Sequence, residues 1–293
     1  MTSYLALTSE QVKKAIETVV KSKPVYAEIL GFYAGVFDAQ EDSKSRLHLE
    51  PLQLSEELQT TKAREKLPLV AIEEFIYDAD ESTSLFLTLC HLAQEAHPKL
   101  SATAGAILKA VETTLKPDAL FSGLLNGNEA LFENMASQLA IEKPVLGFFT
   151  YNSLKPSLGA CADQLAVFLD PDEPWLQGSC PICGSAPILS ILENEGRRAL
   201  VCSFCWHSWS AKRVYCPYCD SSQNKDLHYF YSAEEKGSRV DLCDNCKKYI
   251  KTCDTRNIAR LIYPPLEQIS TMHLDMKAQE MGFEPGIKLF MQV

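Results

Sequence analysis

Four Cys-x-x-Cys pairs between residues 180 and 246 constrain this chain more than any other feature. Eight of its 11 cysteines lie in these pairs, with 18, 10 and 23 residues between successive pairs. A Cys-x-x-Cys turn points two sulfurs to one side, so two such turns supply the four thiolates that zinc or iron accepts. One pair alone is also typical of a redox motif. Four pairs at this spacing predict two closed four-cysteine metal sites.

The segments between the pairs indicate which pairs share a site. Turn signals at 194–197 and 234–237 each stand between two strand-like runs, so each long interval reads as a hairpin. This repeated plan favours sequential pairing over a cross-brace that joins the first pair with the third and the second with the fourth. The predicted metal ligands are Cys180, Cys183, Cys202 and Cys205 in site 1, and Cys216, Cys219, Cys243 and Cys246 in site 2.

The first half of the chain predicts helices. Thr8 and Gln11 have capping-box spacing, and apolar residues follow them at helical intervals. Pro24 is placed to start a second helix. The stretch 43–68 is less regular and predicts a surface segment. Further helices are expected near 70–79, 84–96, 102–115, 128–142 and 157–169, and a last one from Leu266 to Met276 with Gly282 as its C-cap glycine.

The run Asp170-Pro-Asp-Glu-Pro174 breaks the helical pattern, because each proline removes a backbone donor and restricts the residue before it. We therefore expect a multidomain α+β protein with an N-terminal all-α domain, two tandem rubredoxin-like or zinc-ribbon modules and a C-terminal helix. The predicted divisions are 1–172 for the helical domain, 173–214 and 215–253 for the ribbons, and 254–293 for a segment whose helix packs on the ribbons or on the helical domain.

Charge and hydropathy limit the classes of function. The formal net charge is −10, and residues 180–260 hold 12 basic against 9 acidic side chains, so two divalent four-thiolate sites make that module slightly negative. A nucleic-acid ribbon usually has a positive domain, so we expect no nucleic-acid partner. No apolar run is long enough to cross a membrane. No export signal is evident, so we expect a cytoplasmic protein whose thiols stay reduced and bind metal.

No spacing typical of covalent catalysis is present: neither a Ser-His-Asp order, nor a Gly-rich phosphate loop, nor His-Glu-x-x-His. The sequence therefore predicts a protein that is not an enzyme. His207 could be a spare ligand or a partly buried surface histidine. Cys161 and Cys253 could be redox partners or small buried hydrophobic residues, and Cys90 is expected to lie in the hydrophobic core.

Several of these runs resemble the formate dehydrogenase accessory protein family, FdhE. They are Cys180-Pro-Ile-Cys183-Gly-Ser-Ala-Pro187, Gly196-Arg-Arg-Ala-Leu-Val-Cys202-Ser-Phe-Cys205 with Trp209 and Arg213, Val240-Asp-Leu-Cys243-Asp-Asn-Cys246 with Tyr249-Ile-Lys251, and the closing Gly282-Phe283. The resemblance is specific from about 175 to 285 and looser in the helical half, for example around Lys23-Pro24-Val-Tyr26.

The resemblance implies a cytoplasmic, non-catalytic assembly factor that binds the catalytic subunit of an exported formate dehydrogenase before transport, and that needs its Cys-x-x-Cys motifs. Zinc in both sites is the expected cofactor, and iron is possible in the same shells. Two alternatives stay open. Iron in these shells would suit a rubredoxin-like electron-transfer protein, and Arg197, Arg198, Lys212 and Arg213 near aromatic side chains would suit a nucleic-acid-binding ribbon. The sequence does not decide between a monomer and a homodimer.

Overall fold

The computed structural model describes residues 7–170, 175–193, 196–232, 235 and 237–287. These residues fall into two compact units, which are described separately below. Residues 171–174 of the predicted break, and half of each predicted turn (194 and 195, 234 and 236), lie outside the described residues. The predicted four-part domain division stays a prediction.

The helical unit comprises Ala27–Gln53 and Val70–Gln164. Its helices are α2 (Ala27–Arg46), α4 (Ala79–Gln94), α5 (Pro98–Val111), α6 (Pro117–Leu125), α7 (Glu129–Leu139) and α8 (Lys143–Ala166). The last two residues of α8 belong to the other unit. Its core holds large, fully buried side chains, among them Phe86, Phe121 and Phe149. The aromatic rings of Phe86 and Phe121 lie edge to face with centroids 6.1 Å apart. The helical content that the sequence predicts for this region is confirmed.

Several helix boundaries differ from the prediction. The helix expected at 70–79 is only a 3₁₀ turn (Ile72–Glu74), and α6 is not predicted by the sequence. The helix expected at 157–169 begins at Lys143, with Pro156 in its interior. A proline removes the donor to the carbonyl four residues earlier, here that of Asn152. The Gln40 side chain on α2 replaces this donor, because its Nε2 donates to the Asn152 carbonyl oxygen at 2.8 Å.

The second unit contains the sheet and comprises the described residues within Met1–Tyr26, Leu54–Leu69 and Leu165–Lys288. Its helices are α1 (Ser9–Ser22), α3 (Glu56–Glu65), α9 (Pro264–Ile269) and α10 (Met272–Glu280), with 3₁₀ turns at Pro24–Tyr26 and Thr255–Asn257. The predicted capping box is present at the start of α1, where Thr8 and Gln11 exchange hydrogen bonds between side chain and backbone. The stretch predicted to be irregular contains α3, which has Ser55 as its N-cap.

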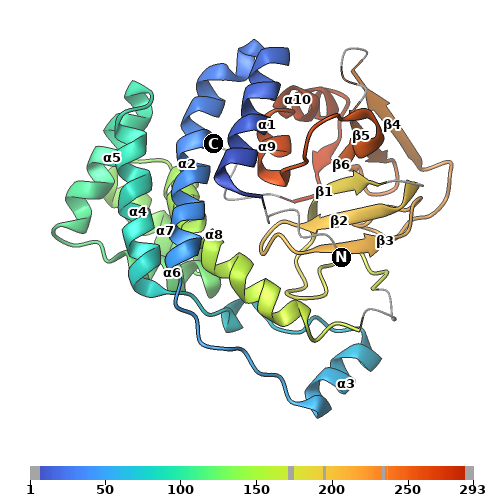
Figure 1. The fold of residues 1–293 in the computed structure, drawn as a ribbon, viewed down its shortest axis with the longest axis horizontal. Helices are drawn as coiled ribbons and strands as arrows, with labels where there is room; N and C mark the ends of the chain where they lie inside the picture. The colour runs from blue at the N-terminus through green and yellow to red at the C-terminus, as the bar shows by residue number, and fades with distance from the viewer. Residues whose placement is uncertain (1–6, 171–174, 194–195, 233–234, 236, 288–293) are drawn as a thin grey trace. The chain divides into compact units, whose positions relative to one another are not determined.

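Seven strands of the described residues form one sheet in the order β3-β2-β1-β6-β5-β4, and β7 also pairs with β6 (Figure 1). The strands are β1 (Pro187–Leu192), β2 (Arg198–Cys202), β3 (Ser208–Ala211), β4 (Leu227–Tyr231), β5 (Ser238–Cys243), β6 (Lys248–Asp254) and β7 (Glu284–Pro285). The first three and the next three strands are two antiparallel ribbons of the same plan. The predicted α+β fold, with helices followed by two ribbons, is therefore confirmed.

The two ribbons are joined, which the sequence does not predict. Strand β1 of the first ribbon pairs in parallel with β6 of the second, with Ser190 opposite Thr252. Two side chains add to this junction. The Gln268 Nε2 donates to the Ile188 carbonyl at 2.9 Å, and the Thr255 hydroxyl donates to the Leu192 carbonyl at 3.0 Å.

The predicted C-terminal helix is divided into α9 and α10 by Ser270 and Thr271. Helix α10 packs on the second ribbon, in a core cluster made of Val240, Leu242, Tyr249, Leu274, Ala278 and Phe283. Gly282 has φ +84°, and the Phe283 N–H donates to the Ala278 carbonyl at 3.1 Å, so the predicted C-cap glycine is confirmed.

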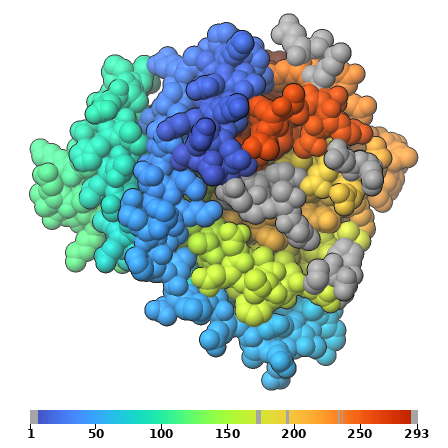
Figure 2. All heavy atoms as spheres, in the orientation of Figure 1, coloured from blue at the N-terminus to red at the C-terminus, as the bar shows by residue number. Residues whose placement is uncertain are grey.

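Helix α1 lies beside the C-terminal helices, as the blue and orange-red segments of Figures 1 and 2 show. The Lys23 ammonium donates to the Ser270 carbonyl at 2.9 Å, and the Tyr26 hydroxyl bonds to Nδ1 of His273 at 2.7 Å. These contacts connect α1 and the turn after it to the helices that cover the sheet.

Candidate metal centres

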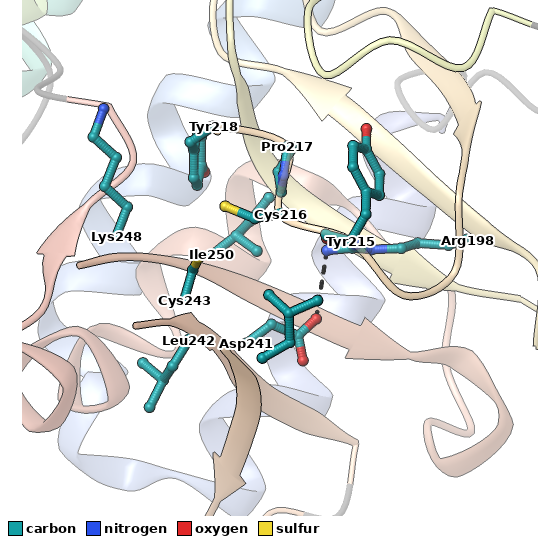
Figure 3. Close-up of a pocket in the computed structure, with 11 residues that line it drawn as sticks. Arg198, Tyr215, Cys216, Pro217, Tyr218, Asp241, Leu242, Cys243, Lys248 and Ile250 are labelled. Atoms are coloured by element: carbon teal, nitrogen blue, oxygen red, sulfur yellow. Dashed lines mark hydrogen bonds and ion pairs between the residues drawn. The ribbon is translucent and has the colours of Figure 1, made fainter. Parts of the chain in front are cut away.

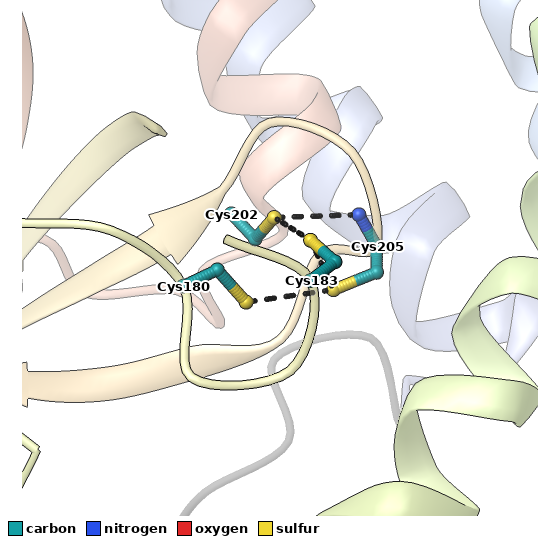
Figure 4. A group of neighbouring side chains, drawn as sticks. All are labelled: Cys180, Cys183, Cys202 and Cys205. Carbon is teal, nitrogen blue, oxygen red and sulfur yellow. Dashed lines mark hydrogen bonds between the residues drawn. The ribbon is translucent and has the colours of Figure 1, made fainter. Parts of the chain in front are cut away.

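The structure brings the eight predicted cysteine ligands together in two groups of four. The first group is Cys180, Cys183, Cys202 and Cys205, and the second is Cys216, Cys219, Cys243 and Cys246. In each group the ligand atoms lie within 4.8 Å of one another. Figure 4 shows the sulfurs of the first group pointing toward a common centre from two facing loops. Each group closes one ribbon, and the cross-braced arrangement is not what the structure shows.

All four Cys-x-x-Cys turns share one backbone feature. The residue after the second cysteine is left-handed in each: Gly184 (φ +73°), Trp206 (φ +61°), Asp220 (φ +56°) and Lys247 (φ +56°). In three turns its N–H donates to the carbonyl of the first cysteine, at 2.9 Å for Gly184, 2.9 Å for Asp220 and 2.8 Å for Lys247. This closed turn holds both sulfurs on one side. The sequence indicates this left-handed conformation only at position 184, because only there is the residue a glycine.

The sulfur separations suit a tetrahedral metal ion. They are 3.4 Å for Cys183–Cys202, 3.7 Å for Cys180–Cys205 and 3.7 Å for Cys219–Cys243. Four sulfurs at the usual zinc–sulfur distance of about 2.3 Å lie about 3.8 Å apart. A disulfide needs about 2.0 Å between its sulfurs, and none of these eight cysteines forms one. The residues present therefore fit a zinc or iron ion in each group.

Hydrogen bonds and burial act in opposite directions on the thiols. In the first group, N–H groups of Phe204 and Cys205 donate to the Cys202 sulfur at 3.3 and 3.4 Å. Hydrogen bonds from the neighbouring thiols lower the pKa of Cys183, whereas burial raises the pKa of Cys180 and Cys205 well above that of an ordinary thiol. Four buried thiols so close together cannot all be deprotonated unless a cation lies among them. Such a cluster is therefore typical of a metal-binding site.

The second group has one thiol that is readily ionised. Burial raises the pKa of Cys219, but hydrogen bonds led by the one from Asn245 outweigh burial and bring it down to about 7. The Asn245 Nδ2 lies 3.4 Å from the Cys219 sulfur. Burial raises the pKa of Cys216 and of Cys246. The hydrogen bond from Asn245 therefore favours the thiolate form of Cys219.

A buried arginine connects the two ribbons next to the second group (Figure 3). The Arg198 side chain, on β2, donates to the Tyr215 carbonyl at 2.8 Å and to the Ser190 hydroxyl at 2.8 Å. Its Nη2 lies 3.5 Å from the Asp241 carboxylate on β5. The hollow that Arg198, Tyr215 and Asp241 line also reaches Cys216 and Cys243. Arg198 is only 5% exposed, so it is not available to contact a nucleic-acid phosphate as one of the alternatives requires.

The other candidate residues lie outside the two groups. His207 follows the first group; its Nε2 is buried with no hydrogen-bond partner among the described residues, and burial lowers its pKa to about 4. Cys253 is buried on β6. Cys90 and Cys161 are buried on α4 and α8, where burial raises their pKa to about 12 and about 11. None of these three cysteines belongs to a metal-ligand cluster within the described part of the chain.

None of the described helices is both long and apolar enough to cross a membrane.

Comparisons with known proteins point to one family. The family profile described as "FdhE, central domain" matches residues 179–213, which contain the first cysteine group. The "Protein FdhE homolog" of Aquifex aeolicus is 36% identical over 147 residues, which are 49% of this chain and 50% of that protein. The "Protein FdhE homolog" of Pectobacterium carotovorum is 28% identical over 268 residues, which are 87% of this chain and 78% of that protein. The chain thus spans half the length of the Aquifex relative and a larger share of the Pectobacterium one.

The fold is similar to that of a solved structure over almost the whole chain. The crystal structure of the FdhE protein from Pseudomonas aeruginosa superposes with a TM-score of 0.65, and the match covers 97% of this chain and 96% of that one, at 18% sequence identity. This similarity shows that the two proteins share a fold.

Proposed function

Because the chain belongs to the FdhE family, we propose that it is an accessory protein of a formate dehydrogenase. It binds the catalytic subunit of that enzyme in the cytoplasm and supports its maturation before export. The observation that carries this proposal is the pair of four-cysteine groups, one on each ribbon of a single sheet, the first of which lies in the segment that the family profile matches. The protein itself transforms no substrate.

We propose that Cys180, Cys183, Cys202 and Cys205 hold one metal ion and that Cys216, Cys219, Cys243 and Cys246 hold a second. Zinc bound by four thiolates supplies folding energy and has no open coordination position. The residues around the ions then have a structural role, because the turns hold the sulfurs and Arg198 keeps the two ribbons in register through Tyr215 and Asp241.

The partner proposal is tested by affinity capture from cells grown without oxygen, in which the catalytic subunit is present and not yet mature. The wild-type chain is expected to retain the subunit. Cys219→Ala is expected to lose it, whereas Cys90→Ala, which removes a buried cysteine of the helical unit, is expected to retain it. Failure of the wild-type chain to retain the subunit under these conditions would contradict the proposal.

Electron transfer by iron is the second candidate function, and one observation favours it. Sulfurs in both groups accept N–H hydrogen bonds, which stabilise the more negative, reduced state of an iron–thiolate centre. An iron-loaded protein would then have a visible absorption band that bleaches reversibly on reduction. Protein isolated without oxygen that contains zinc alone would exclude this candidate.

A further inference from the structure

The two cysteine groups differ in their exposure to solvent. In the first group all four cysteines are buried, and the most exposed, Cys183, is 5% exposed. In the second group Cys216 and Cys243 are buried, but Cys219 and Cys246 are partly exposed. The groups therefore have the same ligands and similar sulfur separations but different access from the outside.

The first group is covered by segments from elsewhere in the chain. The Leu69 N–H donates to the Pro181 carbonyl at 2.9 Å, so the segment that ends at Leu69 lies over the first turn. A Cβ on Gly184 would lie 3.2 Å from the Pro68 ring, which shows how closely the two segments pack. The indole N–H of Trp209, which is 1% exposed, donates to the Gln177 carbonyl at 3.1 Å. An external ligand cannot approach these sulfurs unless such contacts open.

The second group is open to solvent on the side of Cys219 and Cys246, although the β7 segment contacts the turns on which these two cysteines lie. The residues that follow these two cysteines, Asp220 and Lys247, are exposed, and so is Asn245. The Asn245 side chain, which bonds to the Cys219 sulfur, is itself in contact with solvent. Two of the four sulfurs are therefore within reach of a small chelator or of a donor group on another molecule.

Metal ions leave four-thiolate sites when an incoming ligand attacks the metal or when one thiolate detaches, and both routes need access to the site. We propose that the second group is an exchangeable metal site and the first a permanent one. The exchanging ion is a thiophilic divalent cation such as Zn²⁺ or Fe²⁺, and it enters and leaves beside Cys219 and Cys246. This inference rests on the proposed binding of a metal by both groups.

The β7 segment packs against both turns of the second group. The Glu284 N–H of β7 donates to the Lys247 carbonyl at 2.8 Å, directly after the fourth turn. Gly286 packs against the ring of Tyr218, inside the third turn, so closely that a Cβ there would overlap the ring. Loss of the metal is therefore expected to loosen both turns together with the β7 segment. The first group keeps its own contacts and stays closed.

The test uses the full chain loaded without oxygen with two Zn²⁺ per chain. An excess of a chelator that changes colour when it binds zinc captures each zinc ion and reports its release. N-ethylmaleimide labelling with peptide mass spectrometry identifies the thiols that become free. One zinc ion is expected to leave about tenfold faster than the other, a rate ratio that corresponds to about 1.4 kcal/mol. The peptides that contain Cys219 and Cys246 are expected to be labelled first.

Two variants that keep all eight cysteines assign the fast and the slow phase of zinc release to the two groups. Asn245→Ala removes the hydrogen bond to Cys219 and is expected to accelerate only the fast phase. Pro68→Gly loosens the cover of the first group and is expected to accelerate only the slow phase. Release of both ions at one rate, or earlier labelling of Cys180 or Cys205, would overturn the proposal. A chain that binds no zinc would contradict both the exchange proposal and the two proposed metal sites. Failure to capture the catalytic subunit, with zinc release as expected, would contradict only the proposed partner.

Discussion

At the scale of single residues, the cysteine sites depend on a backbone conformation that most side chains disfavour. Trp206, Asp220 and Lys247 are left-handed at positions equivalent to Gly184. This conformation costs a residue with a Cβ about 1–2 kcal/mol. At Asp220 and Lys247 the hydrogen bond that closes the turn offsets part of this cost, and a bound metal would offset more. All four turns can therefore share one backbone geometry, although only the first has a glycine after its second cysteine.

Gly184→Ala is expected to lower the free energy of unfolding of the metal-loaded protein by about 1–2 kcal/mol. The new methyl group has both an unfavourable φ of +73° and a close contact with Pro68. Denaturant unfolding measures the change. Gly31→Ala is the matched control, because a Cβ there meets nothing within 4 Å and the position lies in α2. The control is expected to be neutral or to gain up to about 1 kcal/mol. A neutral Gly184→Ala would contradict this explanation.

At the scale of elements, helix α8 shows how a distant side chain can allow a proline inside a helix. Gln40 donates to the carbonyl that Pro156 leaves without a helical donor. Both Gln40 and Asn152 are buried, so water does not replace this bond. The sequence predicts a helix only at 157–169, because local sequence does not show such a partner, which lies 112 positions earlier.

Gln40→Met is expected to destabilise the helical unit by about 1–3 kcal/mol, because it leaves a buried carbonyl without a donor. The same substitution in a Pro156→Ala background is expected to cost less, since the N–H of the new alanine can bond to Asn152. Urea unfolding followed by circular dichroism measures the four proteins of this cycle. An equal cost of Gln40→Met in both backgrounds would show that Gln40 does not compensate for the proline.

The elements are easier to predict from the sequence than their assembly. Helical periodicity predicts α1 with its capping box, and the hairpin signals predict both ribbons, because these are local patterns. The parallel pairing of β1 with β6 joins residues about 60 positions apart in sequence. Spacing alone does not report such pairing, nor does it reveal the Arg198–Asp241 contact between the ribbons. The unequal exposure of the two cysteine groups also depends on tertiary cover, above all that of Pro68 and Leu69 over the first turn.

At the scale of the whole molecule, the chain combines a helical unit with a sheet unit that contains both candidate metal centres. Its formal net charge of −10 suits a protein partner with basic segments better than a nucleic acid. The joined sheet makes the two centres parts of one structure. A partner that binds beside the second centre would respond to its occupancy, since this centre is the more accessible of the two.

The most direct test of the two-site proposal is the metal content of the chain purified without oxygen from its native host, measured by mass spectrometry together with the visible spectrum. The wild-type chain is expected to contain two metal ions. The double variants Cys180→Ser/Cys183→Ser and Cys243→Ser/Cys246→Ser are each expected to retain one. Two zinc ions without colour would make both centres structural, and iron with a reducible band would favour electron transfer. One ion per wild-type chain, or none, would contradict the presence of two sites.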